Sequence, residues 1–205
     1  MISRRHLMIA SALGALAPRF AFAQSDGDAA MLISQFAQKG IVEILAAKIP
    51  NAEKQMRFRE LFKTFFDLPA IGRFVLGRYA RAVKPEEMST FTPLFEDVIV
   101  YTWSRRFSEY NGQTLKVGSS TPDGEDGAIV KSTIVGNAGE NYAVDWRLRK
   151  RPDGWKIVDV IVAGVSMAIT YRNEYNTIIA QQGGMAGLVS QLQKQVGELK
   201  AAQPA

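Results

Sequence analysis

The sequence contains no cysteine and only one histidine, His6, among its 205 residues. Without cysteine the chain forms no disulfide and performs no thiol chemistry. His6 lies in an N-terminal segment that we expect to be removed. The mature chain then also lacks Ser-His-Asp and Cys-His triads and the usual zinc ligands. We therefore expect no metal site and no cofactor, and a fold that depends on a packed hydrophobic core.

The first 23 residues have the three parts of an export signal. MISRRH is basic, LMIASALGALAP is apolar, and Ala21-Phe22-Ala23 fits a cleavage site. The apolar part has about a dozen residues, whereas about 20 are needed to span a bilayer. We predict a signal peptide over 1–23, cleavage near Ala23, and a single domain over 24–205. Arg4 and Arg5 fit a twin-arginine signal as well as an ordinary secretory one, and the sequence leaves both routes open.

The chain that remains after removal of this segment has no large excess of positive charge. Arg4, Arg5 and Arg19 leave with it, so that 22 basic residues face 20 acidic ones. Nucleic-acid-binding domains are strongly basic, so we predict no nucleic-acid partner. An acidic run near residue 125 lacks the spacing and length of a calcium-binding loop, which also predicts no metal.

The hydrophobic pattern changes twice along the chain. Apolar residues recur at helical spacing from about residue 33 to 111. From Thr114 the pattern becomes four strands separated by turns rich in Gly, Asn and Asp: LKVGS, AIVKSTIVG, NYAVDWRLRK and WKIVDVIVA. Helical spacing returns after Gly164. We therefore predict an α+β fold in which helices pack on a curved four-stranded antiparallel sheet.

The last predicted strand is apolar on both faces. Strict alternation places Ile157, Asp159 and Ile161 on one face and valines on the other. A curved sheet around helices rich in phenylalanine would enclose a conical cavity. Either protein side chains fill this space as an ordinary core, or an apolar ligand occupies it, and the composition alone does not separate the two interpretations.

Three segments resemble the MlaC-type periplasmic phospholipid-binding proteins, also called the toluene-tolerance family. They are FDLPAIGRFVLGRY (66–79), LFEDVIVYTWSRRFSEYNGQ (94–113) and DWRLRKRPDGWKIVDVIVAGVSMAITYRNEY (145–175). The resemblance runs from about residue 30 to about 199. It implies an NTF2-like cone with an apolar cavity. Ala163 departs from the pattern, because the family often has an acidic residue before Gly-Val-Ser-Met.

The resemblance also implies a function. Such a protein is a periplasmic carrier that holds the acyl tails of phospholipids and shuttles lipid between outer- and inner-membrane systems, which maintains outer-membrane lipid asymmetry. The implied partners are a phospholipid, an inner-membrane ABC transporter complex and an outer-membrane lipoprotein complex, with transient contact to the membrane surface. A related subgroup is linked to hopanoids, which leaves a hopanoid or other apolar ligand as an alternative.

Candidate lipid-binding residues come from the apolar positions of the third and fourth helices, the last two strands and the following turn. They are Phe74, Val75, Tyr79, Phe95, Ile99, Val144, Trp146, Val158, Val160, Val162, Val165 and Met167. We expect Gly164 to permit a sharp turn and Ser166 to cap the next helix.

Two further interpretations concern charged residues. The basic cluster Arg147, Arg149, Lys150 and Arg151 is either a solvated strand face or a contact with anionic membrane. Asp159 is a carboxylate in an apolar strand. Burial would raise the pKa of such a group and suit it to act as a base in an isomerase or hydrolase. Pairing with a neighbouring arginine is the other role open to Asp159. We expect no enzyme activity.

Overall fold

The computed structural model describes residues 21–137 and 139–202. Almost all of the predicted signal peptide falls on residues 1–20, outside these ranges. Among the described residues, no helix is long and apolar enough to cross a membrane.

Five antiparallel strands form one open sheet, and their order in the sheet is their order along the chain. They are β1 (Thr114–Pro122), β2 (Gly127–Val135), β3 (Asn141–Arg151), β4 (Gly154–Val162) and β5 (Val165–Ser166). The predicted α+β class and the four-strand meander are confirmed. The number of strands was wrong by one, because the short β5 follows β4.

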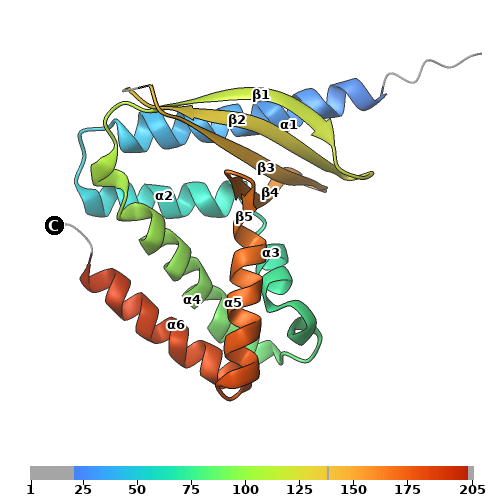
Figure 1. Ribbon diagram of the computed structural model, residues 1–205, viewed down its shortest axis with the longest axis vertical. Helices are drawn as coiled ribbons and strands as arrows, with labels where there is room; N and C mark the ends of the chain where they lie inside the picture. The colour runs from blue at the N-terminus through green and yellow to red at the C-terminus, as the bar shows by residue number, and fades with distance from the viewer. Residues whose placement is uncertain (1–20, 138, 203–205) are drawn as a thin grey trace, which may run out of the picture.

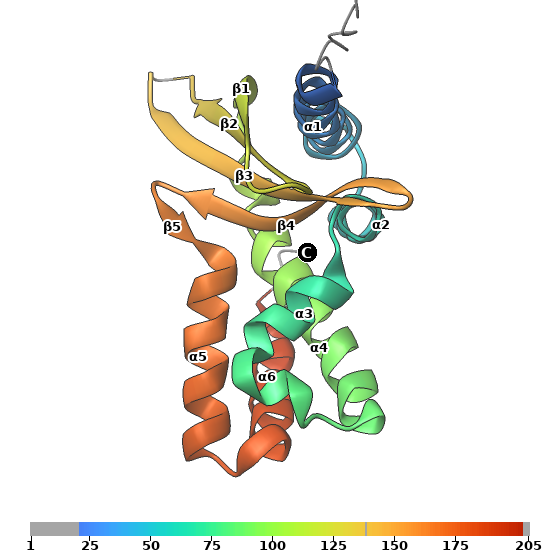
Figure 2. The same cartoon turned by 90° about the vertical axis from the view of Figure 1, so that its right-hand side faces the viewer.

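Helices cover this sheet and extend away from it (Figure 1). Helix α1 runs along β1 and β2, and α2 packs against β4 and α4. Helices α3, α4, α5 and α6 form a bundle at one end, and β5 leads directly into α5 (Figure 2). The helices are α1 (Ala21–Gln38), the π-helix η1 (Lys39–Leu45), α2 (Asn51–Phe65), α3 (Leu68–Leu76), the 3₁₀ helix η2 (Gly77–Arg81), α4 (Pro85–Ser104), the 3₁₀ helix η3 (Phe107–Glu109), α5 (Met167–Gln181) and α6 (Gly184–Ala201).

Local capping explains where two of these helices begin. The Asp67 side chain accepts a hydrogen bond from the Ala70 N–H at 3.0 Å at the start of α3. The Ser166 hydroxyl accepts from the Ile169 N–H at 3.1 Å at the start of α5. Each side chain satisfies a backbone donor that the first turn of a helix leaves unpaired. The predicted cap at Ser166 is thereby confirmed.

The extra strand arises from a two-residue turn between β4 and β5. Ala163 has φ +48° and Gly164 has φ +82°. Positive φ at both central residues is the condition for a tight hairpin turn. Val162 then pairs with Val165, and Ile161 pairs with Ser166. The sharp turn lies where Gly164 predicts it, whereas the returning strand is only two residues long and was not predicted.

We expect Ala163→Asn to stabilise the protein by about 1 kcal/mol, because asparagine tolerates the left-handed conformation better than alanine does. Ala163→Val is the matched control and should destabilise, since a β-branched side chain is strained at positive φ. Urea unfolding of the two variants measures the difference. A valine variant as stable as the asparagine variant would contradict this account of the turn.

A bulge in β4 changes which of its side chains share a face. Val160 lies opposite Trp146, whereas Ile157 lies opposite Leu148, and the register skips Val158. Directly opposed residues of antiparallel strands project to the same side. Ile157 and Val160 therefore share a face, and the strict alternation predicted from the sequence was wrong. The bulge accounts for part of the doubly apolar character of this strand.

Candidate ligand-binding cavity

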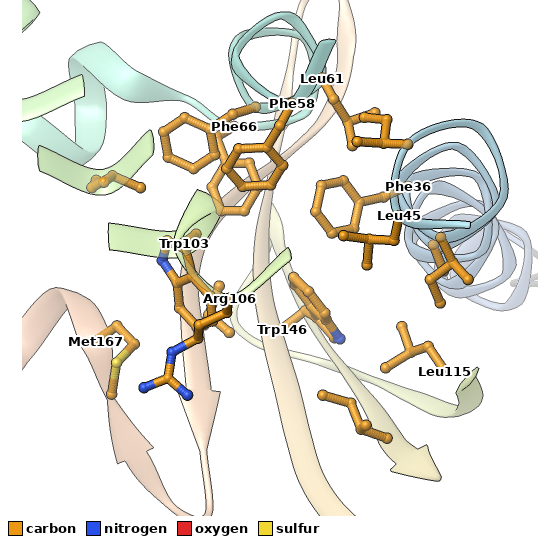
Figure 3. Close-up of a pocket in the computed structure, with 18 of the residues that line it drawn as sticks. Phe36, Leu45, Phe58, Leu61, Phe66, Trp103, Arg106, Leu115, Trp146 and Met167 are labelled. Carbon is orange, nitrogen blue, oxygen red and sulfur yellow. The ribbon is translucent and has the colours of Figure 1, made fainter. Parts of the chain in front are cut away.

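A cavity of about 340 Å³ lies between the sheet and the helices (Figure 3). Its size falls within the range of about 300–1,000 Å³ that is typical of small-molecule sites. Its walls come from α1, η1, α2, α3, α4, η3, strands β1 to β4 and the start of α5, and they are almost entirely apolar. The cavity shows that side chains do not completely fill the space inside the curved sheet.

Six of the predicted residues line this cavity. They lie on α4, on the facing parts of β3 and β4, and at the first residue of α5. The six residues are Phe95, Ile99, Trp146, Val158, Val160 and Met167. Trp146 and Val160 lie directly opposite one another on neighbouring strands. Phe36 of α1 meets the Trp146 ring edge-on, with the ring centroids 5.3 Å apart. Helix α1 and the sheet therefore meet at the cavity wall.

The other six predicted residues do not line the cavity, and three of them belong to α3 and η2. Helix α3 packs against α5, which directs its apolar face into the helical bundle. Val75 is fully buried there, and Phe74 is 41% exposed under the guanidinium of Arg172. Tyr79 lies beneath Arg78, whose carbon Cζ is 4.9 Å from the ring centroid.

The remaining three predicted residues belong to β3, β4 and β5. Val144 is buried and pairs with the partly exposed Val162, one step beyond the Trp146–Val160 pair. Val165 is 55% exposed on β5. These residues share the apolar pattern of the strands but lie past the limit of the cavity. The pattern identifies an apolar face and does not show how far along the strand the cavity extends.

Nine of the cavity-lining residues outside the predicted set come from α1, η1 and α2. The residues are Phe36, Ala37, Gly40, Ile41, Ile44, Leu45, Phe58, Leu61 and Phe62. Several of these positions form apolar stripes at helical spacing, which would ordinarily indicate a filled core. Four of them belong to the π-helix η1, and π-helices are frequent at functional sites. No periodic or capping signal in these residues distinguishes a π-helix from an α-helix.

Asp159 is the only carboxylate among the cavity-lining residues of the described chain. Both of its oxygens accept hydrogen bonds, and one of them also takes part in an ion pair. Arg147 Nη1 lies 3.2 Å from Asp159 Oδ2, and Ser166 Oγ donates to the same oxygen at 2.6 Å. The Ala168 N–H donates to Asp159 Oδ1 at 3.0 Å. The residue is 5% exposed. Asp159 therefore joins β3, β4 and the start of α5. Of the roles left open for Asp159, the structure shows pairing with a neighbouring arginine, Arg147.

The tyrosines near the cavity remain neutral. Burial raises the pKa of the Tyr171 hydroxyl, with a smaller contribution from Glu174. Burial also raises the pKa of Tyr175, and the neighbouring Tyr171 and Glu174 add to the effect. Tyr171 lines the cavity, whereas Tyr175 packs behind it against Phe91 and Phe95. These hydroxyls therefore add no charge to the apolar space at physiological pH.

The geometry is that of a binding pocket for an apolar molecule. Within residues 21–137 and 139–202, no group of three or more His, Cys, Asp or Glu side chains could hold a metal ion. The sequence model for the MlaC protein family matches residues 37–194. The chain belongs to the MlaC family.

Two curated relatives of this MlaC-family chain support the assignment. The toluene tolerance protein Ttg2D of Pseudomonas putida is 27% identical over 106 residues, which cover 52% of this chain and 49% of the relative. The intermembrane phospholipid transport system binding protein MlaC of Haemophilus influenzae is 25% identical over 176 residues, which cover 82% of each chain. The match therefore spans about half of the first relative and most of the second.

A solved structure shares the fold. The phospholipid-binding protein from Ralstonia solanacearum, determined in complex with a phospholipid, superposes with a TM-score of 0.76 at 22% sequence identity. The match covers 84% of this chain and 99% of the Ralstonia chain. At this identity the similarity shows the fold, including the helices packed on an open antiparallel sheet.

Proposed function

We propose that this chain is a periplasmic lipid carrier that holds the acyl tails of a phospholipid in the cavity. The observation that carries the proposal is a cavity of about 340 Å³ whose walls are nearly free of polar groups. Each methylene removed from water contributes about 0.8 kcal/mol, so two long acyl chains carry on the order of 20 kcal/mol. A carrier must shield the tails from water and also release them, which a smooth apolar lining allows.

The names of the relatives agree with this function. The Haemophilus relative is named as a phospholipid transport binding protein, and the Ralstonia structure contains a phospholipid. The alternative ligand is a hopanoid or another apolar molecule, which the same lining would also accept. An isomerase or hydrolase based on Asp159 is not supported, because an ion pair and two hydrogen bonds already engage its carboxylate.

The proposed setting is the periplasm, with residues 24–205 acting as a single lipid-binding domain after export. The proposed partners are an inner-membrane ABC transporter complex and an outer-membrane lipoprotein complex. Lipid shuttled between them would maintain the asymmetry of the outer membrane. These partners rest on the family membership of the chain, since a cavity accounts for lipid binding and does not by itself identify a docking site.

The basic β3–β4 hairpin is less suited to membrane contact than its sequence indicates. Arg147 and Arg149 both pair with Asp123, with N–O distances of 3.2 and 2.7 Å. Arg151 pairs with Asp67 at 2.6 Å and thereby joins the hairpin to the start of α3. The Arg149 guanidinium also lowers the pKa of the Asp123 carboxyl through its hydrogen bond. Most of this charge therefore stabilises the fold.

A different surface is better suited to transient membrane contact. Phe74, Val165 and Ile169 are 41%, 55% and 47% exposed. Arg172 stacks on Phe74, and Arg73 is exposed beside it. Apolar side chains with basic neighbours favour the surface of an anionic bilayer, where each basic residue contributes about 1 kcal/mol.

The proposal is tested by organic extraction of protein purified from the periplasm without detergent, followed by mass spectrometry. We expect roughly one diacyl phospholipid per chain, because the cavity is too apolar to remain filled with water. Hopanoid in place of phospholipid would overturn the proposed substrate and retain the carrier mechanism. A protein that is empty and takes up no lipid from vesicles would contradict the carrier function itself.

A further inference from the structure

The cavity has a single arginine on its lining, and this residue lies at one end of the apolar space. Arg106 follows the last turn of α4 and lines the cavity together with Trp103 and Met167 (Figure 3). In the described part of the chain, Arg106 and Asp159 are the only charged lining residues. Trp103 is 38% exposed, so this end of the cavity reaches the protein surface.

The two charges differ in how they are compensated. Asp159 is 5% exposed and is neutralised by Arg147. Arg106 has an exposed ion pair with Glu109 at 3.9 Å, and both side chains are 68% exposed. That distance exceeds hydrogen-bonding range, and such exposed pairs contribute little. The guanidinium therefore leaves a positive charge at the mouth of an apolar cavity.

Two polar residues that follow Arg106 in the chain also line the cavity. Tyr110 and Gln113 both line the cavity just before β1 begins. The Gln113 amide oxygen accepts the Asn111 N–H at 3.0 Å. The NH₂ group of Gln113 therefore supplies the donors of this side chain. The phenol of Tyr110 is a further donor. The polar part of the lining thus consists mainly of groups that donate hydrogen bonds to an anion.

We infer that Arg106 binds the phosphate of a lipid whose acyl chains occupy the cavity. The inference rests on the proposed carrier function and adds to it the residue that recognises the phosphate of the lipid and so distinguishes it from a neutral lipid. A guanidinium presents a planar fork of donors that matches two oxygens of one phosphate. The tails extend toward Phe36 and Trp146, and the phosphate remains at the exposed end beside Trp103. A neutral lipid of the same chain length gains the apolar contacts alone.

The experiment measures which lipids the protein removes from a mixed bilayer. The mature protein is incubated with phosphatidylcholine vesicles that contain equal amounts of phosphatidylglycerol and diacylglycerol with the same acyl chains. The bound lipid is then quantified by mass spectrometry. We expect Arg106→Gln to lower the ratio of bound phosphate-bearing lipid to bound diacylglycerol about tenfold relative to the unmodified chain, which is the effect of one charge-assisted hydrogen bond.

Arg105→Gln is the matched control. Arg105 is the adjacent residue, is exposed and does not line the cavity, so the same loss of charge there should leave the ratio unchanged. An unchanged ratio in the Arg106 variant, or an equal fall in both variants, would overturn the inference. Failure of the unmodified protein to take up any of the lipids would instead refute the carrier function, so the two failures are distinguishable.

A second arm separates lipid phosphate from free phosphate. Inorganic phosphate in large excess should leave bound phosphatidylglycerol in place, because phosphate alone lacks the apolar contacts of the tails. Displacement of the lipid by phosphate would show that Arg106 belongs to a site for the free anion and would overturn the assignment to a lipid. Arg106→Lys keeps the charge without the planar fork, and we expect it to retain part of the preference.

Discussion

Replacing Val160 with tryptophan is expected to reduce lipid bound per chain at least tenfold while the protein remains folded. Val160 lines the cavity opposite Trp146, so a larger ring at this position occupies space that the acyl chains need. Excluding only two methylenes costs about 1.6 kcal/mol, which already exceeds a factor of ten. Extraction and mass spectrometry measure the lipid, and circular dichroism with thermal melting verifies the fold.

Val162→Trp is the matched control for this experiment. Val162 lies on the same strand and the same face, two residues further along, and does not line the cavity. We expect its lipid content to match that of the unmodified chain. Ile99→Trp blocks the cavity from α4 on the opposite wall and should reproduce the loss. A folded Val160 variant with full lipid content would show that the ligand lies elsewhere.

Among the substitutions considered for this chain, removing the carboxylate of Asp159 is expected to lower the free energy of unfolding the most. Asp159→Ala removes one of the two carboxylates that pair with Arg147, which keeps Asp123, and it leaves Ser166 Oγ and the buried Ala168 N–H without their acceptors. Each buried donor left without an acceptor costs about 1–3 kcal/mol, so the two lost hydrogen bonds together with the lost ion pair cost about 3 kcal/mol. For a chain of this size such a loss lowers Tm by roughly 10 °C. Differential scanning calorimetry measures the change.

Asp145→Ala is a suitable comparison on the neighbouring strand. Asp145 pairs with Lys131 at 3.5 Å, and that lysine side chain is 59% exposed. Exposed pairs of this kind contribute at most about 1 kcal/mol, so the two aspartates should differ clearly. Equal losses in the two variants would contradict the structural role of Asp159. Asp159→Asn should retain lipid transfer, whereas a reaction that depends on this carboxylate would be abolished.

Much of the fold could be predicted because its signals are local. The change from helical spacing to alternation near Thr114 follows from the residues themselves, and the structure has β1 starting there. Ser166 caps α5 because a hydroxyl at that position reaches a backbone donor three residues away. The two-residue β5 was missed, since so short a strand carries no periodic signal.

The candidate site was predicted less completely because it depends on distances between elements. Val160 and Val162 have similar sequence contexts, but only Val160 lines the cavity. Phe74 and Phe95 both belong to apolar helical stripes. Phe95 lines the cavity, whereas Phe74 is exposed because α3 packs against α5. An apolar residue indicates that its side chain is shielded from water. It does not indicate whether other side chains or a ligand shield it.

The sequence by itself determined the α+β class, the order of helices and strands, the absence of cysteine, the presence of a single histidine, and the resemblance to the MlaC family. These properties follow from residue identity, periodicity and short motifs. Only the tertiary structure decided that α1, η1 and α2 contribute to the cavity wall, that a bulge places Ile157 with Val160, and that Arg106 lies at the mouth. The physical reason is that a cavity is the space left between packed elements. Its shape therefore depends on how the elements pack against each other, which no single segment encodes.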